Sequence, residues 1–229
     1  EPYRRQRQMC IRDRYIILCK WGIKIHQPSW ISIKKTLKES FDVFLNQIFP
    51  TLYNAFSVLL LGVFCGPVAN GLFDAGTKLV DISQQFLKII SRTFFPFLSR
   101  KIDKHTLFSK IYMLFTLIVT LGLIFFAPFL IPVFFSEEFS ESIKVLRLMA
   151  ISGVFLTMSN IYGTNYLIII GRERSLRNLT MYASLLGFVI AIPLIYYGGY
   201  MGAVAIIVFV RMLLGVGSYL LAYNLSLIH

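Results

Sequence analysis

Polar residues recur every three or four positions between Asn70 and Arg92. This spacing places them on one face of a predicted α-helix, in a stripe roughly 80° wide. Apolar residues fill most of the remaining surface. The polar stripe consists of Asn70, Asp74, Lys78, Asp81, Gln85, Lys88 and Arg92. Milder polar exceptions on the same helix are Thr77, Ser83, Gln84 and Ser91.

Long apolar segments recur along the chain, and each is long enough to cross a bilayer, which takes roughly 20 helical residues. Turn signals separate two pairs of them, at Gly66-Pro67 and at Gly198-Gly199. The pattern predicts an all-α membrane protein that forms a bundle of six transmembrane helices. The predicted spans are residues 41–63, 70–92, 111–134, 145–170, 179–197 and 203–223.

Composition supports a membrane protein, because 56% of the residues are hydrophobic, 15% are charged and the mean hydropathy is +0.68. The net charge of +12 does not indicate nucleic-acid binding, since the basic residues are scattered among loops. They gather before the first span, after the second and after the fourth, whereas the loop after the third is acidic. Lys and Arg accumulate in cytoplasmic loops, so we expect both ends of the bundle to be cytoplasmic.

The ends of the chain differ from its middle. The run PYRRQRQMCIRDR resembles translated sequencing-adapter sequence, and we expect residues 1–14 and 225–229 to be non-native; a genuine basic cytoplasmic tail is the alternative. Residues 15–40 are predicted to form a cytoplasmic linker and an amphipathic lead-in on the bilayer surface, with a soluble linker as the alternative. Residues 41–224 would form the transmembrane bundle.

Charges in the middle of a membrane helix need an explanation, because each costs about 2.5–3.5 kcal/mol on insertion scales. Asp74, Lys78 and Asp81 are spaced so that they can partly neutralise one another and simply help the bundle to fold. The stripe continues through Gln85 and Lys88 to Arg92, however. We therefore interpret it as the polar wall of a transport cavity.

Two further residues are candidates for the same cavity. Asn54 interrupts the first span, and Arg211 is a second intramembrane cation, on the sixth. Arg211 could form a structural ion pair with Asp42, Asp74 or Asp81, or its planar guanidinium could bind an anion such as phosphate. The sequence alone leaves both open.

The sequence contains no hydrolytic or metal-binding motif. His26 and His105 fall in predicted loops, and the three cysteines have no metal-ligand spacing. We therefore expect no catalytic residues, no metal, no cofactor and no enzymatic activity.

The run LKESFDVFLNQIFPTLYNAFSVLLLG, and then GLFDAGTKLVDISQQFLKIISRTFFPFLSR, resemble the second half of polysaccharide flippases. These are O-antigen-type (Wzx-like) members of the multidrug/oligosaccharidyl-lipid/polysaccharide exporter superfamily. VLRLMAISGVFLTMSNIYGTNYLIIIGRERSLRN fits the same pattern. The resemblance covers approximately residues 15–223 and implies that the chain is the C-terminal lobe of a two-lobe transporter whose N-terminal lobe is missing.

The resemblance also implies a function: moving undecaprenyl-diphosphate-linked sugar repeat units across the bacterial inner membrane by alternating access. The implied partners are the lipid-linked oligosaccharide, membrane lipids, the other lobe and a polysaccharide polymerase. Lys78, Lys88, Arg92 and Arg211 would face the anionic substrate, and Asp74 and Asp81 would couple transport to protons or sodium.

Other functions remain open at this point. A multidrug/cation antiporter and a lipid II flippase belong to the same superfamily, and an isolated lobe could be an inactive fragment. A membrane glycosyltransferase or polymerase should have a large extracytoplasmic loop, which is not found between the predicted spans.

Overall fold

The computed structural model describes residues 29–101 and 104–226, and their regular structure is entirely helical. The chain divides into two compact units, residues 1–40 and 41–229, and the contacts and the cavity described below lie in the second unit. Residues 1–28 and 227–229 lie outside the described residues. The predicted non-native end at residues 1–14 and most of the one at 225–229 fall there. The elements are α2 (Trp30–Arg100), α3 (His105–Phe135), η2 (Glu137–Phe139), α4 (Ser142–Met158), η3 (Ser159–Leu167) and α5 (Glu173–Ser226).

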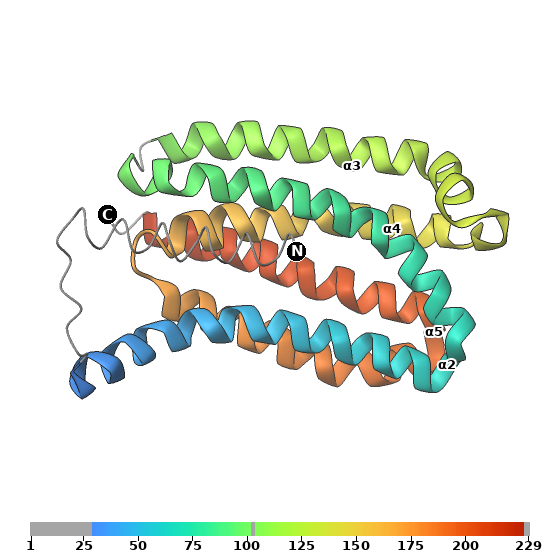
Figure 1. The fold of residues 1–229 in the computed structure, drawn as a ribbon, viewed down its shortest axis with the longest axis horizontal. Helices are drawn as coiled ribbons and strands as arrows, with labels where there is room; N and C mark the ends of the chain where they lie inside the picture. The colour runs from blue at the N-terminus through green and yellow to red at the C-terminus, as the bar shows by residue number, and fades with distance from the viewer. Residues whose placement is uncertain (1–28, 102–103, 227–229) are drawn as a thin grey trace, which may run out of the picture. The chain divides into compact units, whose positions relative to one another are not determined.

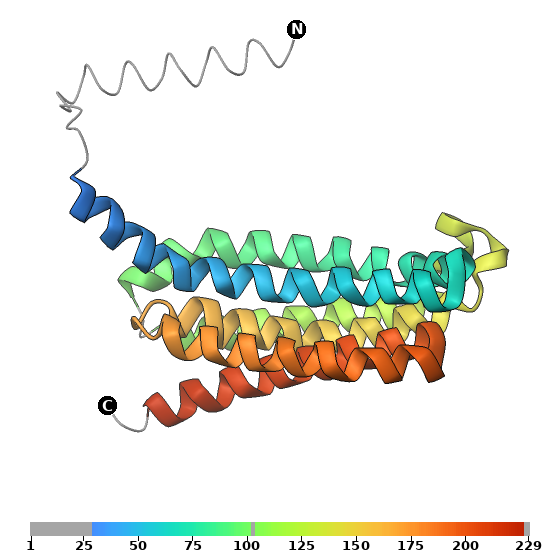
Figure 2. The same ribbon diagram turned by 90° about the horizontal axis from the view of Figure 1, so that it is seen from below.

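Helices α2 and α5 both reverse direction along their length (Figures 1 and 2). Each contains one residue with non-helical dihedral angles: Gly66 in α2, with φ 80° and ψ 179°, and Gly199 in α5, with φ 56° and ψ −137°. A positive φ strains any residue with a Cβ, so glycine is the natural choice at both turns. These are the two places where the sequence predicted turns.

Four helical stretches are long and apolar enough to cross a membrane: Asn54–Arg100, His105–Phe135, Ser142–Leu167 and Glu173–Asn224. Their outward faces are apolar as well; on α3, the side chains of Phe125 and Phe129 are 76% and 65% exposed. Large exposed apolar faces suit contact with lipid. The chain is therefore a multi-pass membrane protein, and its described residues form helices and no strands.

The first segments of α2 and α5 run parallel to each other. The rings of Phe56 and Phe188 lie 4.9 Å apart, and those of Phe64 and Tyr196 lie 5.8 Å apart. After Gly66, α2 packs on a different partner, α4, where the Ser142 hydroxyl donates a 2.8 Å hydrogen bond to the Leu72 carbonyl. The two segments of α2 thus hold α5 and α4 in one bundle.

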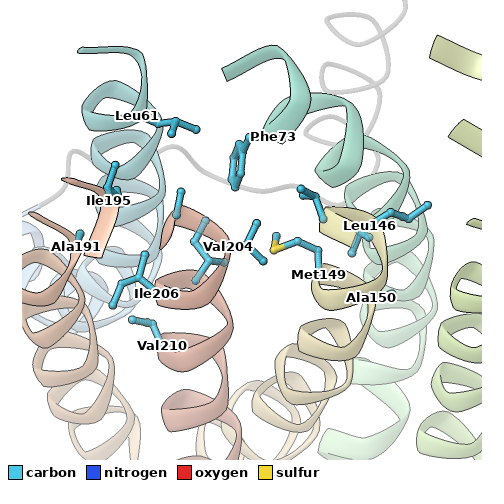
Figure 3. Packing of buried hydrophobic residues seen from close by; sticks show 14 of the residues in the cluster. Leu61, Phe73, Leu146, Met149, Ala150, Ala191, Ile195, Val204, Ile206 and Val210 are labelled. Atoms are coloured by element: carbon cyan, nitrogen blue, oxygen red, sulfur yellow. The ribbon is translucent and has the colours of Figure 1, made fainter. Parts of the chain in front are cut away.

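A cluster of buried apolar side chains fills the end of the bundle near the two turns (Figure 3). We call it the apolar half. Met149 of α4 lies near its centre, with Val204 of α5 beside it (Figure 3). Its members come from every long helix, so their burial holds the helices together. Among the most buried are Leu61, Val80, Leu146, Met149, Val204 and Ile206.

The other end of the bundle is tied by hydrogen bonds to backbone carbonyls. The Tyr112 hydroxyl of α3 donates to the Leu87 carbonyl at 2.8 Å. His105 was expected in a loop, and that expectation is wrong: His105 is the first residue of α3, and its buried Nε2 lies 3.1 Å from the Ile161 carbonyl oxygen. A buried imidazole needs such a partner, and this one joins α3 to η3.

Candidate transport cavity

A cavity of about 430 Å³ occupies the half of the bundle away from the apolar half. Both segments of α2 and of α5 contribute to its wall, together with α4 and η3, whereas α3 contributes none of its lining residues. We call it the polar cavity, because most of its lining side chains are polar. They are Thr51, Asn54, Asp81, Gln84, Gln85, Lys88, Ser91, Arg92, Leu156, Ser159, Asn160, Thr164, Ile168, Leu176, Thr180, Arg211 and Leu214.

The charges on this wall are mostly positive. Lys88, Arg92 and Arg211 are cationic, and Asp81 is the one carboxylate among the lining residues. The excess of two positive charges would draw anions into a space with low-dielectric walls, where charges interact more strongly than in bulk water. An anionic ligand therefore suits the cavity better than a cation.

Arg211 is the most constrained of these cations. The residue is only 7% exposed, and its Nη1 donates a 3.0 Å hydrogen bond to the Ser152 hydroxyl of α4. Its Nη2 lies 4.0 Å from Oδ1 of Asp81, whose side chain is 52% exposed. Both interpretations of Arg211 are therefore compatible with its position, since it contacts a carboxylate at long range and also lines the cavity.

The predicted site residues fall into two groups. Asn54, Asp81, Gln85, Lys88, Arg92 and Arg211 line the polar cavity. Asp74 and Lys78 are exposed, but they are absent from the lining because they lie on the part of α2 beside the apolar half. The roles assigned to all eight residues remain predictions.

The fourth predicted span is not a uniform α-helix. Its second part, η3, is a π-helix that supplies Ser159, Asn160 and Thr164 to the cavity wall. Segments of π-helix are rare and occur frequently at functional sites. The Nδ2 of Asn165 donates a 2.7 Å hydrogen bond to the Ser91 hydroxyl of α2, which fixes η3 beside the polar stripe.

Two inward-facing side chains of α2, Gln84 and Ser91, were not among the predicted site residues, because their polarity breaks the apolar face only mildly. Both are buried and both line the cavity. The sequence signal that could have indicated them is a second row of residues on α2, spaced alternately by four and three positions. In this row, polar and apolar residues alternate on the buried face of the helix. This series is Phe73, Thr77, Val80, Gln84, Leu87 and Ser91, and all six are buried.

Gln84 has space for its amide because it faces Gly153 of α4. A Cβ at Gly153 would lie 2.5 Å from Gln84 Nε2. The Oε1 of Gln84 and the Nδ2 of Asn160 are buried and have no hydrogen-bond partner among the described residues. Both residues line the polar cavity, and each has one buried side-chain atom that lacks a partner, an acceptor in Gln84 and a donor in Asn160.

The chain is similar in sequence to known proteins. A profile for the family described as "Polysaccharide biosynthesis protein" matches residues 11–102. A candidate O-antigen transporter from Shigella dysenteriae is 30% identical over 185 residues, which cover 78% of this chain and 46% of that protein. The predicted resemblance to Wzx-like polysaccharide flippases is confirmed. A second candidate O-antigen transporter, from Escherichia coli K12, is 23% identical over 175 residues, covering 71% of this chain and 41% of that protein.

The chain thus spans less than half the length of the curated relatives that it matches. Both relatives are named as transporters, which agrees with the expectation that the chain is not an enzyme. No solved structure matches the chain significantly.

Proposed function

We propose that the chain is one lobe of a flippase that moves a diphosphate-linked oligosaccharide, carried on undecaprenol, across the bacterial inner membrane. The observation that carries this proposal is the polar cavity, with Lys88, Arg92 and Arg211 on its wall and Asp81 as its one lining carboxylate. A diphosphate is a compact, multiply charged anion that Arg and Lys bind through charge-assisted hydrogen bonds. The relatives' name, O-antigen transporter, is consistent with such a substrate.

The breaks at Gly66 and Gly199 support six crossings rather than four, because each divides one long helix into two antiparallel segments. With six crossings, the basic loops place both ends of the bundle in the cytoplasm. The polar cavity then lies in the cytoplasmic half of the membrane, and the apolar half seals the outer side. This arrangement suits the inward-facing state of an alternating-access transporter that is completed by an N-terminal lobe.

Asp81 is the coupling candidate that lies within the cavity. Its carboxylate is half-exposed and lies near the Arg211 guanidinium, so it would compete for that guanidinium with any anion that enters the cavity. Binding of a proton or sodium ion at Asp81 would free Arg211 for the substrate, which links the two events. Asp74 and Lys78 remain candidates for coupling and substrate contact outside the cavity lining.

The proposal is tested by replacing Arg211 or Lys88 with Ala in the protein as its gene encodes it. We expect loss of O-antigen-type polysaccharide from the cell surface, measured by gel staining of extracted lipopolysaccharide, with unchanged protein in the membrane fraction. Lys110→Ala is the matched control, because Lys110 is an exposed lysine of α3 that does not line the cavity. Normal export by both cavity variants would refute the proposed function.

Two intermediate results are also informative. Loss of surface polysaccharide in Lys110→Ala as well would point to a general defect in assembly and would remove the support for the cavity. Rescue of export by Arg211→Lys would show that a positive charge is sufficient there, whereas failure of rescue would favour the bidentate geometry of Arg.

A further inference from the structure

The polar cavity is lined by two chemically different kinds of polar side chain, charged groups and neutral amides or hydroxyls. Its cations account for binding an anion, but Gln84 and Asn160 carry no charge and contribute little to that attraction. A buried amide atom without a partner is costly, so it is retained where a ligand or water completes its hydrogen bonds. The unpaired atoms of Gln84 and Asn160 therefore have room in their hydrogen bonding for a ligand group or a bound water.

We propose that Gln84 and Asn160 form a binding site for a carbohydrate hydroxyl or acetamido group within the polar cavity, whose wall also carries Lys88, Arg92 and Arg211. This proposal rests on the proposed function, because it concerns the sugar portion of the same diphosphate-linked substrate.

The chemistry of the two atoms points to a sugar. Gln84 Oε1 accepts a hydrogen bond, and Asn160 Nδ2 donates one. A hydroxyl group both donates and accepts, and so does an acetamido group, whereas a phosphate ester at neutral pH mainly accepts. A phosphate could therefore satisfy Asn160 Nδ2, but it would leave Gln84 Oε1 unpaired.

The surroundings of the two amides also suit a sugar. Ser159 and Thr164 of η3 line the same cavity and add hydroxyl groups that can donate or accept. Leu156 and Leu214 add apolar surface against which the C–H face of a sugar ring can pack.

The position of Gln84 is set by Gly153. Gln84 is only 5% exposed, and a Cβ at Gly153 would lie 2.5 Å from its Nε2 and 3.4 Å from its Cδ. The amide is the far end of a flexible side chain, so a methyl group at Gly153 would displace it while leaving the helix backbones in place. Gly153 is thus a positioning residue for Gln84.

The test uses two soluble probes, ethyl phosphate and glucose 1-phosphate, which share a phosphate monoester and differ in the sugar. Binding to the purified full-length protein in detergent is measured by isothermal titration calorimetry. The native protein should bind glucose 1-phosphate about fivefold more tightly than ethyl phosphate, roughly the effect of one additional hydrogen bond. Gln84→Ala and Asn160→Ala should each bring this ratio close to one without changing the affinity for ethyl phosphate.

Ser184→Ala is the matched control, because Ser184 also carries a buried oxygen without a partner but does not line the cavity. It should keep the native ratio. Gly153→Ala should lower the ratio while the melting temperature stays within a few degrees, so it provides the test if Gln84→Ala does not fold. An unchanged ratio in Gly153→Ala and Asn160→Ala would overturn the proposal and assign the two amides to bound water.

Failure of the proposed function would look different. Lys88→Ala should weaken both probes equally, because both carry the same phosphate. If Lys88→Ala changed neither affinity, the anion site would be wrong even where the sugar ratio responded to Asn160→Ala. If the native protein bound both probes equally tightly and Lys88→Ala weakened the binding of both, the sugar site alone would be refuted.

Discussion

The apolar half and the polar cavity are built from the same helices, yet they bury different chemistry. On α2, Val80 is fully buried in the apolar half, whereas the next residue, Asp81, lines the cavity. On α5, Val210 is buried in the apolar half, and the next residue, Arg211, lines the cavity. The boundary between the two halves therefore crosses several helices at one level, near the Arg211–Ser152 hydrogen bond.

Packing and the candidate binding site are therefore separated along the helix axis. In the apolar half, close packing of Leu, Ile, Val and Met holds the bundle together. In the cavity half, Gln84 and Asn160 each keep one buried side-chain atom that has no hydrogen-bond partner among the described residues, as do Asn70 and Ser184 outside the cavity lining. Substitutions in the apolar half should therefore mainly lower the free energy of unfolding, whereas substitutions of cavity-lining residues should mainly change ligand affinity.

The largest effect on stability is expected in the apolar half. Met149→Ala should lower the free energy of unfolding by about 2–5 kcal/mol, because Met149 is 1% exposed and its loss leaves a cavity. Unfolding in lipid bicelles, followed by circular dichroism, measures the change. Leu148→Ala on the same helix is the control, since Leu148 is 39% exposed and should cost far less. Equal losses would contradict a packed core at this level.

A smaller loss of stability is expected at Gly215, where α5 approaches α4. A Cβ there would lie 2.5 Å from the Phe155 carbonyl oxygen, which is backbone and cannot move alone. Gly215→Ala should therefore destabilise the protein by about 1–3 kcal/mol. Gly153→Ala meets the flexible end of Gln84 instead and should cost less than Gly215→Ala in the same melting experiment. The reverse order would contradict the packing described here.

The next effect concerns binding and compares two lysines of the polar stripe. Lys88 lines the cavity and Lys78 does not. Lys88→Ala should weaken binding of inorganic pyrophosphate about tenfold, near the lower end of what a hydrogen bond to a charged group contributes. Lys78→Ala should change it less than twofold. Isothermal titration calorimetry measures both affinities. Equal losses of pyrophosphate affinity in Lys88→Ala and Lys78→Ala would show that the anion site extends along the whole polar stripe.

The smallest effect is expected at Asp81. Asp81→Asn removes the carboxylate that shares Arg211, so pyrophosphate should bind roughly two- to fivefold more tightly, as expected for a half-exposed ion pair. Export should nevertheless fall if Asp81 couples transport to an ion. Weaker pyrophosphate binding in this variant would mean that Asp81 does not compete with the ligand.

The sequence predicted much of this architecture from local patterns. Long apolar segments predicted the membrane helices, and glycine at Gly66 and Gly199 predicted the reversals, because both signals are local. The helices extend beyond the predicted spans; α3, for example, starts at His105 rather than near Ile111. Apolar content defines the part of a helix inside the hydrocarbon, but hydrogen bonds such as that of His105 define where the helix ends.

The site could be predicted only in part, because its geometry depends on residues far apart in the chain. The stripe indicated Lys88 and Arg92, but nothing local indicates that Ser152 holds Arg211 or that Gly153 makes room for Gln84. The π-helical turn at Ser159–Leu167 also has no signal in the apolar pattern. These features arise from packing between helices and not from periodicity within one.

Water access along α2 tests the central claim most directly. Single cysteines at Val80 and at Gln85, in a protein whose own cysteines are replaced by Ala, can be labelled with a sulfonated methanethiosulfonate reagent in membranes open to the cytoplasmic side. The cysteine replacing Gln85 should react rapidly and be protected by pyrophosphate, whereas the one replacing Val80 should stay unmodified. Labelling at position 80 but not at 85, or equal labelling without protection, would contradict a water-filled anion site beside a dry core.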